Sequence, residues 1–230
     1  MVPKKKGDTA AKGGLSREAI IAAALAIIDR DGYKGLSMRR LGKELGVDPM
    51  AIYYHIPSKE ALLDGLVEVI MNEIDLGLDD PRRGIKDRVL TAARAYRGAL
   101  LKHPSLIQAV VNRPPRTATA LKPVEVLLGI FLDGGFKPED AMAAVNIIAT
   151  YVRGSVIHEA AYLFNIDGFD LHKSVDSFED AMRLLEPEDF PNLIQAAAGG
   201  CFLEFEEEFD RGARAVIRGL VETYGRKGGD

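Results

Sequence analysis

The sequence holds few of the residues on which disulfide-rich domains, metal sites and membrane proteins depend. It has one cysteine, Cys201, and no tryptophan, which excludes an intramolecular disulfide framework and a cysteine-cluster zinc site. No apolar run approaches the roughly 18 residues that span a bilayer. The best candidate, residues 19–28, is followed at once by Asp29, Arg30 and Asp31, which does not fit a secretory signal. The sequence therefore predicts a cytoplasmic protein with no membrane contact.

Sequence motifs for catalysis are also missing. There is no Gly-x-Ser-x-Gly nucleophile motif and no phosphate-binding P-loop. Residues 158–162 fall one residue short of the zinc-protease pattern His-Glu-x-x-His, because Tyr162 replaces the second histidine that zinc needs one turn later. We therefore expect no enzyme, no cofactor and no metal site. A helical enzyme that uses His158 and Glu159 is kept as an alternative.

The charges are distributed unevenly along the 230 residues. Residues 1–60 carry 11 basic and 7 acidic side chains, a net charge of +4, whereas the remainder carries 19 and 27, a net charge of −8. A basic first quarter joined to an acidic remainder suggests two separate tasks in one chain. The first residues hold four lysines and three glycines with almost nothing to bury, so we expect residues 1–15 to form a disordered basic tail.

The apolar residues recur with helical spacing and nowhere alternate as in strands. Ile20, Ala24, Ile27 and Ile28 form one helix face, which begins at Ser16 and stops at Gly32. Further helices are predicted at 37–45, 49–55, 58–76, 85–102, 105–112, 117–133, 138–163 and 202–225, with weaker ones at 177–185 and 188–198. We expect an all-α protein with one domain at 16–62, a second at 63–230, and the helix at 58–76 bridging the two.

Residues 35–63 carry the most specific pattern. Ser37 can cap one short helix, Gly46 ends it, and Asp48 with Pro49 begins the next. This arrangement is a helix-turn-helix, which places its second helix in the major groove of DNA. Tyr53 and Tyr54 are adjacent and cannot both point into the core, so at least one is exposed and can reach DNA. The residues spaced to pack the two helices together are Leu41, Leu45, Val47 and Ile52.

This segment resembles the DNA-binding domain of TetR-family transcriptional regulators. The resemblance rests on Leu-Gly-Val at 45–47, Ala-Ile-Tyr-Tyr-His at 51–55 and Lys-x-x-Leu-Leu at 59–63. The remainder resembles the tetracycline repressor subgroup at 96–101, 112–114, 135–136 and 202–219. The resemblance implies an N-terminal three-helix helix-turn-helix domain, followed by a larger helical domain that binds an effector and dimerises. By family precedent the protein is a repressor.

The resemblance further implies a homodimer that binds a palindromic operator in double-stranded DNA. Its dimer interface would be a four-helix bundle of residues 138–163 and 202–225 from each chain. At Pro49 the tetracycline repressors have a polar amide, so we expect a different operator. The DNA contacts carried over from the family fall on Ser37, Arg39, Pro49, Met50, Ala51, Tyr53, Tyr54, His55 and Lys59.

The implied effector site departs from that of the tetracycline repressors. Where these hold a magnesium–drug chelate with a histidine and a glutamate, this chain has Ala109 or Val110, and His158; Ala92 and Thr150 replace two further drug-facing side chains. We therefore expect a mostly apolar pocket for a small organic molecule with one polar or anionic group, and no magnesium chelate. The residues expected to line it are Tyr96, Val110, Arg113, Tyr151, His158 and Tyr162.

One further alternative is a helical ligand-binding or interaction protein whose N-terminal domain no longer binds DNA. The net charge of +4 on residues 1–60 speaks against it. Salt distinguishes the two, because affinity for phosphates falls steeply with salt, whereas an apolar pocket hardly responds.

Overall fold

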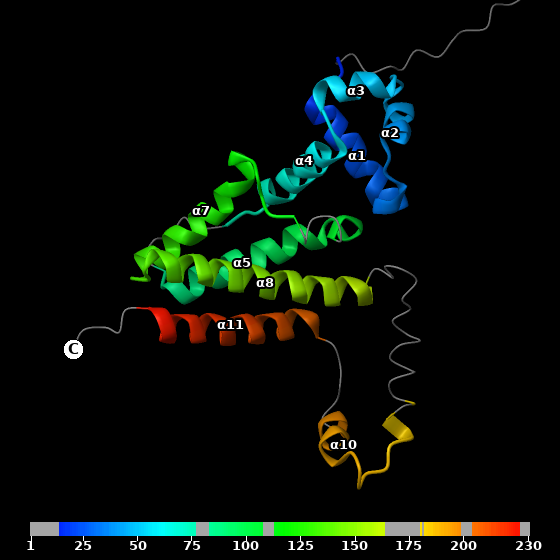
Figure 1. Ribbon diagram of the computed structural model, residues 1–230. Helices are drawn as coiled ribbons and strands as arrows, with labels where there is room; N and C mark the ends of the chain where they lie inside the picture. Colours follow the sequence, from blue (N-terminus) through cyan, green and yellow to red (C-terminus); the bar gives the residue numbers. More distant parts are fainter. Residues whose placement is uncertain are drawn as a thin grey trace, which may run out of the picture. The chain divides into compact units, whose positions relative to one another are not determined.

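The computed structural model describes residues 14–76, 83–107, 113–163, 180, 182–198 and 204–225 (Figure 1). All regular elements within these ranges are helices, which confirms the predicted all-α class. The chain divides into two compact units between Leu62 and Leu63. Most of the predicted basic tail and of the helix predicted at 105–112, and part of the one predicted at 177–185, lie outside the described residues.

The smaller unit is built from short helices with well-formed ends. They are α1 (Arg17–Asp31), the 3₁₀ helix η1 (Tyr33–Gly35), α2 (Met38–Leu45) and α3 (Pro49–His55). The side chain of Ser16 accepts a hydrogen bond from the backbone N–H of Ala19, and Ser37 accepts one from Arg40, so each caps its helix. Their apolar faces meet in a core whose fully buried members are Ile20, Ala24, Ile27, Ile28, Leu41 and Ile52.

Helix α4 (Lys59–Asn72) begins in the smaller unit and ends in the larger one. The sequence predicted that this helix would reach residue 76, but it stops four residues earlier. The N–H of Glu73 is shared between the carbonyls of Val69 and Ile70, a common pattern at a helix end. Ile74 and Leu76 then lie beyond the helix and line a cavity instead of extending its apolar face.

The larger unit is centred on three long helices that all contact one another: α5 (Ile85–Leu101), α8 (Pro138–Leu163) and α11 (Phe205–Tyr224) (Figure 1). Helix α7 (Ala118–Asp133) packs against α5 and α8. The 3₁₀ helix η2 (Pro104–Leu106) follows α5, and α10 (Pro191–Ala198) precedes α11. Phe209 of α11 is buried, whereas Phe205 is only partly buried, because it lies beside His158 at the surface.

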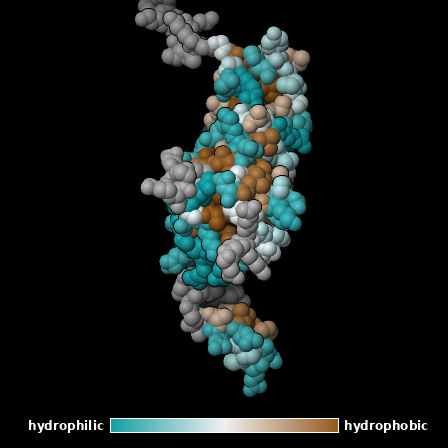
Figure 2. All heavy atoms as spheres, turned by 90° about the vertical axis from the view of Figure 1, so that its left-hand side faces the viewer, coloured by the Kyte–Doolittle hydropathy of each residue, from teal (hydrophilic) through white to brown (hydrophobic). Residues whose placement is uncertain are grey.

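Apolar side chains also reach the surface. Figure 2 shows several of them, in brown, among hydrophilic neighbours on one face of the molecule. Large apolar side chains that are at least 39% exposed include Met142, Ile147 and Ile157 of α8 and Leu121, Val126 and Leu132 of α7. Clustered apolar side chains at a surface are typical of sites of contact with a partner.

Two arginines one turn apart on α5 form ion pairs with α8 and α11, one pair buried and the other partly exposed. Arg97 donates two hydrogen bonds, of 2.8 and 2.5 Å, to the carboxylate of Glu159 on α8, and its guanidinium lies 5.2 Å from the ring centre of Phe209. Arg94 likewise donates two hydrogen bonds to the carboxylate of Asp210 on α11. The side chains of Arg97 and Glu159 are 15% and 5% exposed, whereas Arg94 is 49% exposed.

The hydrogen bonds from Arg94 lower the pKa of Asp210 below its ordinary value of 3.8. The Arg94–Asp210 pair therefore stabilises the fold above that value, and the contribution is lost as the pH falls through the lowered pKa. Because both groups are partly in water, this contribution is small. The buried Arg97–Glu159 pair has a larger effect when one partner is removed, since the other charge is left without compensation.

The pair of arginines provides a stability test. We predict that Arg97→Met lowers the free energy of unfolding by about 3–5 kcal/mol, because it leaves the Glu159 carboxylate buried and unpaired. The matched variant Arg94→Met should cost less than about 1 kcal/mol. Urea denaturation followed by circular dichroism measures both. Equal losses for the two variants would show that burial does not separate the two ion pairs.

Candidate functional site

Two glycines allow α2 and α3 to pack closely around a tight turn. Gly46 ends α2 with φ of 69°, a left-handed conformation that favours glycine. At Gly42 an added Cβ would lie 2.9 Å from the carbonyl oxygen of Val47 and 3.2 Å from Cγ of Pro49. A side chain at position 42 would therefore push α3 away from α2. The turn between the helices is fixed by these two positions.

Helix α3 is fixed at its start and buried on one face only. The Asp48 carboxylate accepts a hydrogen bond of 2.8 Å from the N–H of Met50, and Pro49 occupies the first helical position. Ile52 is fully buried, and the following Ile56 is 1% exposed. These contacts hold a helix of seven residues against the rest of the small unit while its other face is open to solvent.

The open face of α3 presents large side chains to solvent. Met50 is 72% exposed, Tyr53 is 39% exposed and Tyr54 is 88% exposed. The ring of Tyr54 meets that of His55 edge to face, with centroids 5.4 Å apart. Both tyrosines are thus exposed, whereas the sequence required only one. Removing the apolar parts of these side chains from water is favourable. This face of α3 is therefore suited to contact with a partner.

The cations around α3 differ in whether they are already paired. Arg40 bonds the Asp31 carboxylate at 2.5 Å, and Arg30 forms a double hydrogen bond with Glu44. Within the described residues, exposed Arg39 has no ion-pair partner. Lys59, in the first turn of α4, lies 5.5 Å above the ring centre of Tyr33 and is exposed. Arg39 and Lys59 therefore have charge to offer to phosphate groups.

The nine residues predicted to contact DNA thus all belong to α2, α3, their caps and the start of α4. Ser37 accepts a hydrogen bond from the backbone through its oxygen, which leaves its hydroxyl proton to donate. Pro49, Ala51 and His55 are partly buried, and the others are exposed to differing degrees. Each of the nine is positioned by short-range structure, which is the kind of structure that a sequence pattern specifies.

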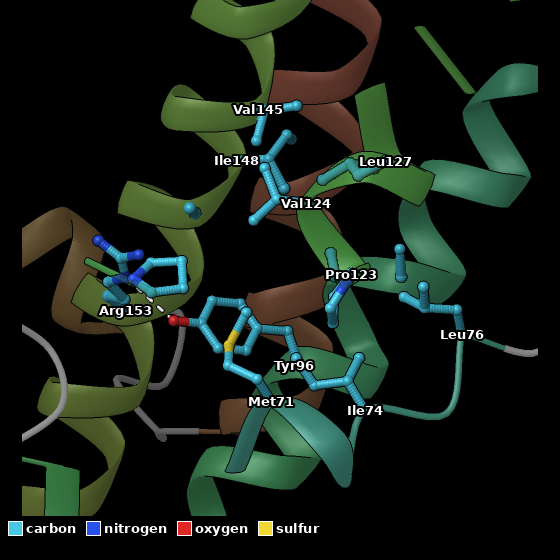
Figure 3. A pocket seen from close by; sticks show the side chains of 14 residues that line it. Met71, Ile74, Leu76, Tyr96, Pro123, Val124, Leu127, Val145, Ile148 and Arg153 are labelled. Atoms are coloured by element: carbon cyan, nitrogen blue, oxygen red, sulfur yellow. Dashed lines mark hydrogen bonds between the residues drawn. The ribbon is translucent and has the colours of Figure 1, made fainter. Parts of the chain in front are cut away.

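The larger unit contains an apolar cavity of about 60 Å³, room for roughly four to six water molecules at 10–15 Å³ each. Figure 3 shows Tyr96, Met71 and Ile74 on one side, Val124, Leu127 and Ile148 on the other, and Arg153 at one end. Its walls come from the end of α4 and from α5, α7 and α8. The remaining lining residues are Leu76, Ala92, Ala93, Pro115, Pro123, Val145 and Ala149.

The residues predicted to line an effector pocket do not share one cavity where the structure describes them. Tyr96 lines the cavity, but Tyr151 and His158 line a separate hollow with Phe205 and Phe209. Tyr151 is held there by a hydrogen bond of 2.9 Å from its hydroxyl to the carbonyl of Phe209. Burial raises the pKa of the Tyr151 phenol. Val110, and the side chain of Tyr162, lie outside what the structure describes.

Arg113, the remaining predicted residue, bonds Asp64 of α4 at 3.0 and 3.2 Å. A second link reaches the end of α4, where Glu73 bonds His103 at 3.1 Å and Lys102 at 3.3 Å. Burial would raise the pKa of Glu73, but the hydrogen bonds from His103 and Lys102 outweigh it and the pKa is lowered. Helix α4, at Asp64, and the residue that follows it, Glu73, are thus tied by charge to segments on either side of η2.

Arg153 is the cavity residue that sequence reasoning missed. Its Nε donates a hydrogen bond of 3.0 Å to the hydroxyl of Tyr96. The signal was present in the sequence, because Arg153 is the one arginine or lysine between residues 138 and 163. A cation on a helix that is otherwise so apolar needs a polar partner.

Comparison with known proteins places this geometry in a family. Residues 20–66 match the family model "Bacterial regulatory proteins, tetR family", and residues 78–224 match "Tetracyclin repressor-like, C-terminal domain". The chain belongs to the TetR family. It is therefore a DNA-binding transcriptional regulator of the helix-turn-helix type.

Relatives of this TetR-family chain cover it to different extents. An HTH-type transcriptional regulator of Saccharopolyspora erythraea is 28% identical over 225 residues, 97% of this chain and 91% of the relative. The class C tetracycline repressor of Escherichia coli is 32% identical over 152 residues, 64% of this chain and 67% of the repressor. The structure of ActR from Streptomyces coelicolor in complex with actinorhodin matches with a TM-score of 0.82 at 25% identity, over 93% of this chain and 100% of ActR.

Membrane spans and metal-binding clusters are both missing from the described residues. No helix among them is both long enough and apolar enough to cross a membrane. They also contain no group of three or more histidine, cysteine, aspartate or glutamate side chains placed to hold a metal ion.

The difference between Arg39 and Arg40 provides a test of the DNA-facing surface. We predict that Arg39→Gln weakens DNA binding and reduces the slope of log affinity against log salt concentration by about 0.9 for each phosphate that is no longer neutralised. Arg40→Gln should leave the slope unchanged, because its guanidinium is bonded to Asp31. Fluorescence anisotropy at several salt concentrations measures both slopes. A larger change for Arg40→Gln would place the phosphate contact on the other side of α2.

Proposed function

We propose that this TetR-family regulator is a repressor that binds a palindromic operator as a homodimer and is released by a small organic molecule in the cavity of Figure 3. The observation that carries the DNA-binding half is the open face of α3. A short helix that is capped, packed on one side, and exposes Met50 and Tyr54 at 72% and 88% suits insertion into a major groove.

The surface of α8 supports the homodimer. Ala143, Ile147, Thr150, Gly154, Ile157 and Ala161 follow one another at spacings of four and three residues. At about 100° per residue these positions form one stripe, on the side opposite the buried Val145, Val152 and Val156. Ile147 and Ile157 are 41% and 47% exposed. The apolar stripe is too regular to face water and is suited to a second copy of the same helix.

Helix α11 contributes a complementary surface of small side chains. Ala215 and Gly219 are exposed, and Gly212 is partly exposed. Small residues allow a partner helix to approach closely. Gly212 has a second role within the chain, because a Cβ there would overlap the hydroxyl of Tyr151. These features favour a four-helix bundle of α8 and α11 from two protomers, the arrangement expected from the family resemblance.

The cavity supports release by an effector. Met71 lies on α4, and Ile74 and Leu76 directly follow it. An organic molecule of drug size needs a pocket of roughly 300–1,000 Å³, so it must displace the walls of a cavity of about 60 Å³. The last turn of α4 is part of the wall that would be displaced, and the first turn of the same helix lies in the DNA-binding unit. An effector that favours a shifted α4 favours a dimer that no longer fits the operator.

The regulator function is tested by selecting ligands from a random pool of double-stranded DNA. We predict that the wild-type protein enriches a palindrome whose half-sites are one helical turn apart, about 34–36 Å. Tyr54→Ala should fold normally and enrich nothing, because it removes the most exposed side chain of α3. The matched control Tyr224→Ala changes an exposed tyrosine of α11 and should enrich the same palindrome. A folded dimer that enriches no sequence would favour a ligand-binding protein that has lost DNA binding.

The dimer surface is tested by two variants of α8. Ile157→Glu places a charge in the stripe, and we predict that it sediments as a monomer and loses operator binding. Met142→Glu is the matched control, because Met142 is 45% exposed on the same helix but lies about 100° from the midline of the stripe. Analytical ultracentrifugation measures both. A dimeric Ile157→Glu variant would show that the protomers associate through another surface.

A further inference from the structure

The cavity contains a single charged side chain. Of the residues that line it, only Tyr96 and Arg153 have polar side chains. Figure 3 shows Arg153 at one end and Leu76 at the opposite end, with apolar side chains between them. A molecule that fills this space meets hydrocarbon along most of its length and a cation at one end.

Arg153 also differs from its neighbouring arginines in its partner. In the same unit, Arg94, Arg97 and Arg113 each donate two hydrogen bonds to a carboxylate. Arg153 instead bonds the neutral phenol of Tyr96 through its Nε. Within the described residues, no carboxylate lies within ion-pair distance of the Arg153 guanidinium.

The unused donors of Arg153 set the chemistry of a ligand. A guanidinium has five N–H groups in a planar fork, and a carboxylate matches two of them at once. One N–H of Arg153 is engaged by Tyr96, which holds the group in place while the terminal nitrogens are left to bind. The side chain is partly buried, so an incoming anion would be less screened than on the open surface.

From this geometry we infer that the cavity takes an apolar organic acid, with its carboxylate on the terminal nitrogens of Arg153 and its hydrocarbon body between Tyr96, Val124 and Ile148. The inference rests on the effector function proposed above and specifies the ligand class for that site. A neutral molecule of the same shape would leave the guanidinium without its counter-ion. A dianion would bring a second charge into the apolar part of the cavity, where nothing in the described lining can pair with it.

The test uses matched pairs of an acid and its amide: benzoate and benzamide, 2-naphthoate and 2-naphthamide, 9-anthracenecarboxylate and its amide. Isothermal titration calorimetry without DNA measures each dissociation constant. A hydrogen bond to a charged group is stronger than one to a neutral group, and the difference corresponds to roughly 10- to 100-fold in affinity between acid and amide. We expect a preference of at least about tenfold for the acid in the pair that fits best.

Variants then locate the preference. Arg153→Gln should bind acid and amide equally, with the affinity for the amide unchanged, and Arg153→Lys should restore part of the preference. Tyr96→Phe should retain it. The control Arg218→Gln removes an exposed arginine of α11 outside the cavity and should behave as wild type. The absence of an acid preference in every pair, or its persistence in Arg153→Gln, would overturn the inference.

A parallel measurement of operator release separates this inference from the proposed function. An acid that binds through Arg153 but does not release DNA would confirm the ligand class and contradict the effector role. An acid and an amide that release DNA equally well would confirm the effector role and contradict the ligand class.

Discussion

In the function proposed above, helix α4 is the element on which the coupling between the cavity and DNA depends. Its first residues, beginning at Lys59, belong to the unit that reads DNA, and its last turn, with Met71, forms part of the cavity wall. Because a helix is stiff along its axis, the proposed displacement of the wall at one end of α4 would also act on the other end. The bonds from Arg113 to Asp64 and from His103 to Glu73 fasten α4 to the chain on both sides of η2.

The exposed face of α3, which we propose to contact DNA, was predictable from the sequence because its determinants are local. Ser37 and Asp48 cap helices through backbone groups two or three residues away, and Gly46 ends a helix through its own conformation. The spacing of Leu41 and Ile52 then specifies which faces are buried. With those faces assigned, the exposure of Tyr53 and Tyr54 follows from helical geometry alone.

The cavity was not predictable in the same way, because its lining comes from four helices far apart in the sequence. Tyr96 was identified, whereas Tyr151 and His158 share the apolar helix α8 but point to a different hollow. Two positions along a helix correspond to a rotation of about 200°, so Tyr151 and Arg153 leave α8 on different faces. Which face meets the cavity is decided by how α8 packs on α5, α7 and α11, and a single sequence does not specify that packing.

The central claim is that occupation of the cavity and occupation of the operator oppose each other. The most direct measurement is the affinity of the dimer for its selected operator, free and saturated with a compound that binds the cavity, together with the affinity for that compound with and without operator. The account predicts that each partner weakens the other by the same factor. A compound that binds the cavity tightly and leaves operator affinity unchanged would contradict it.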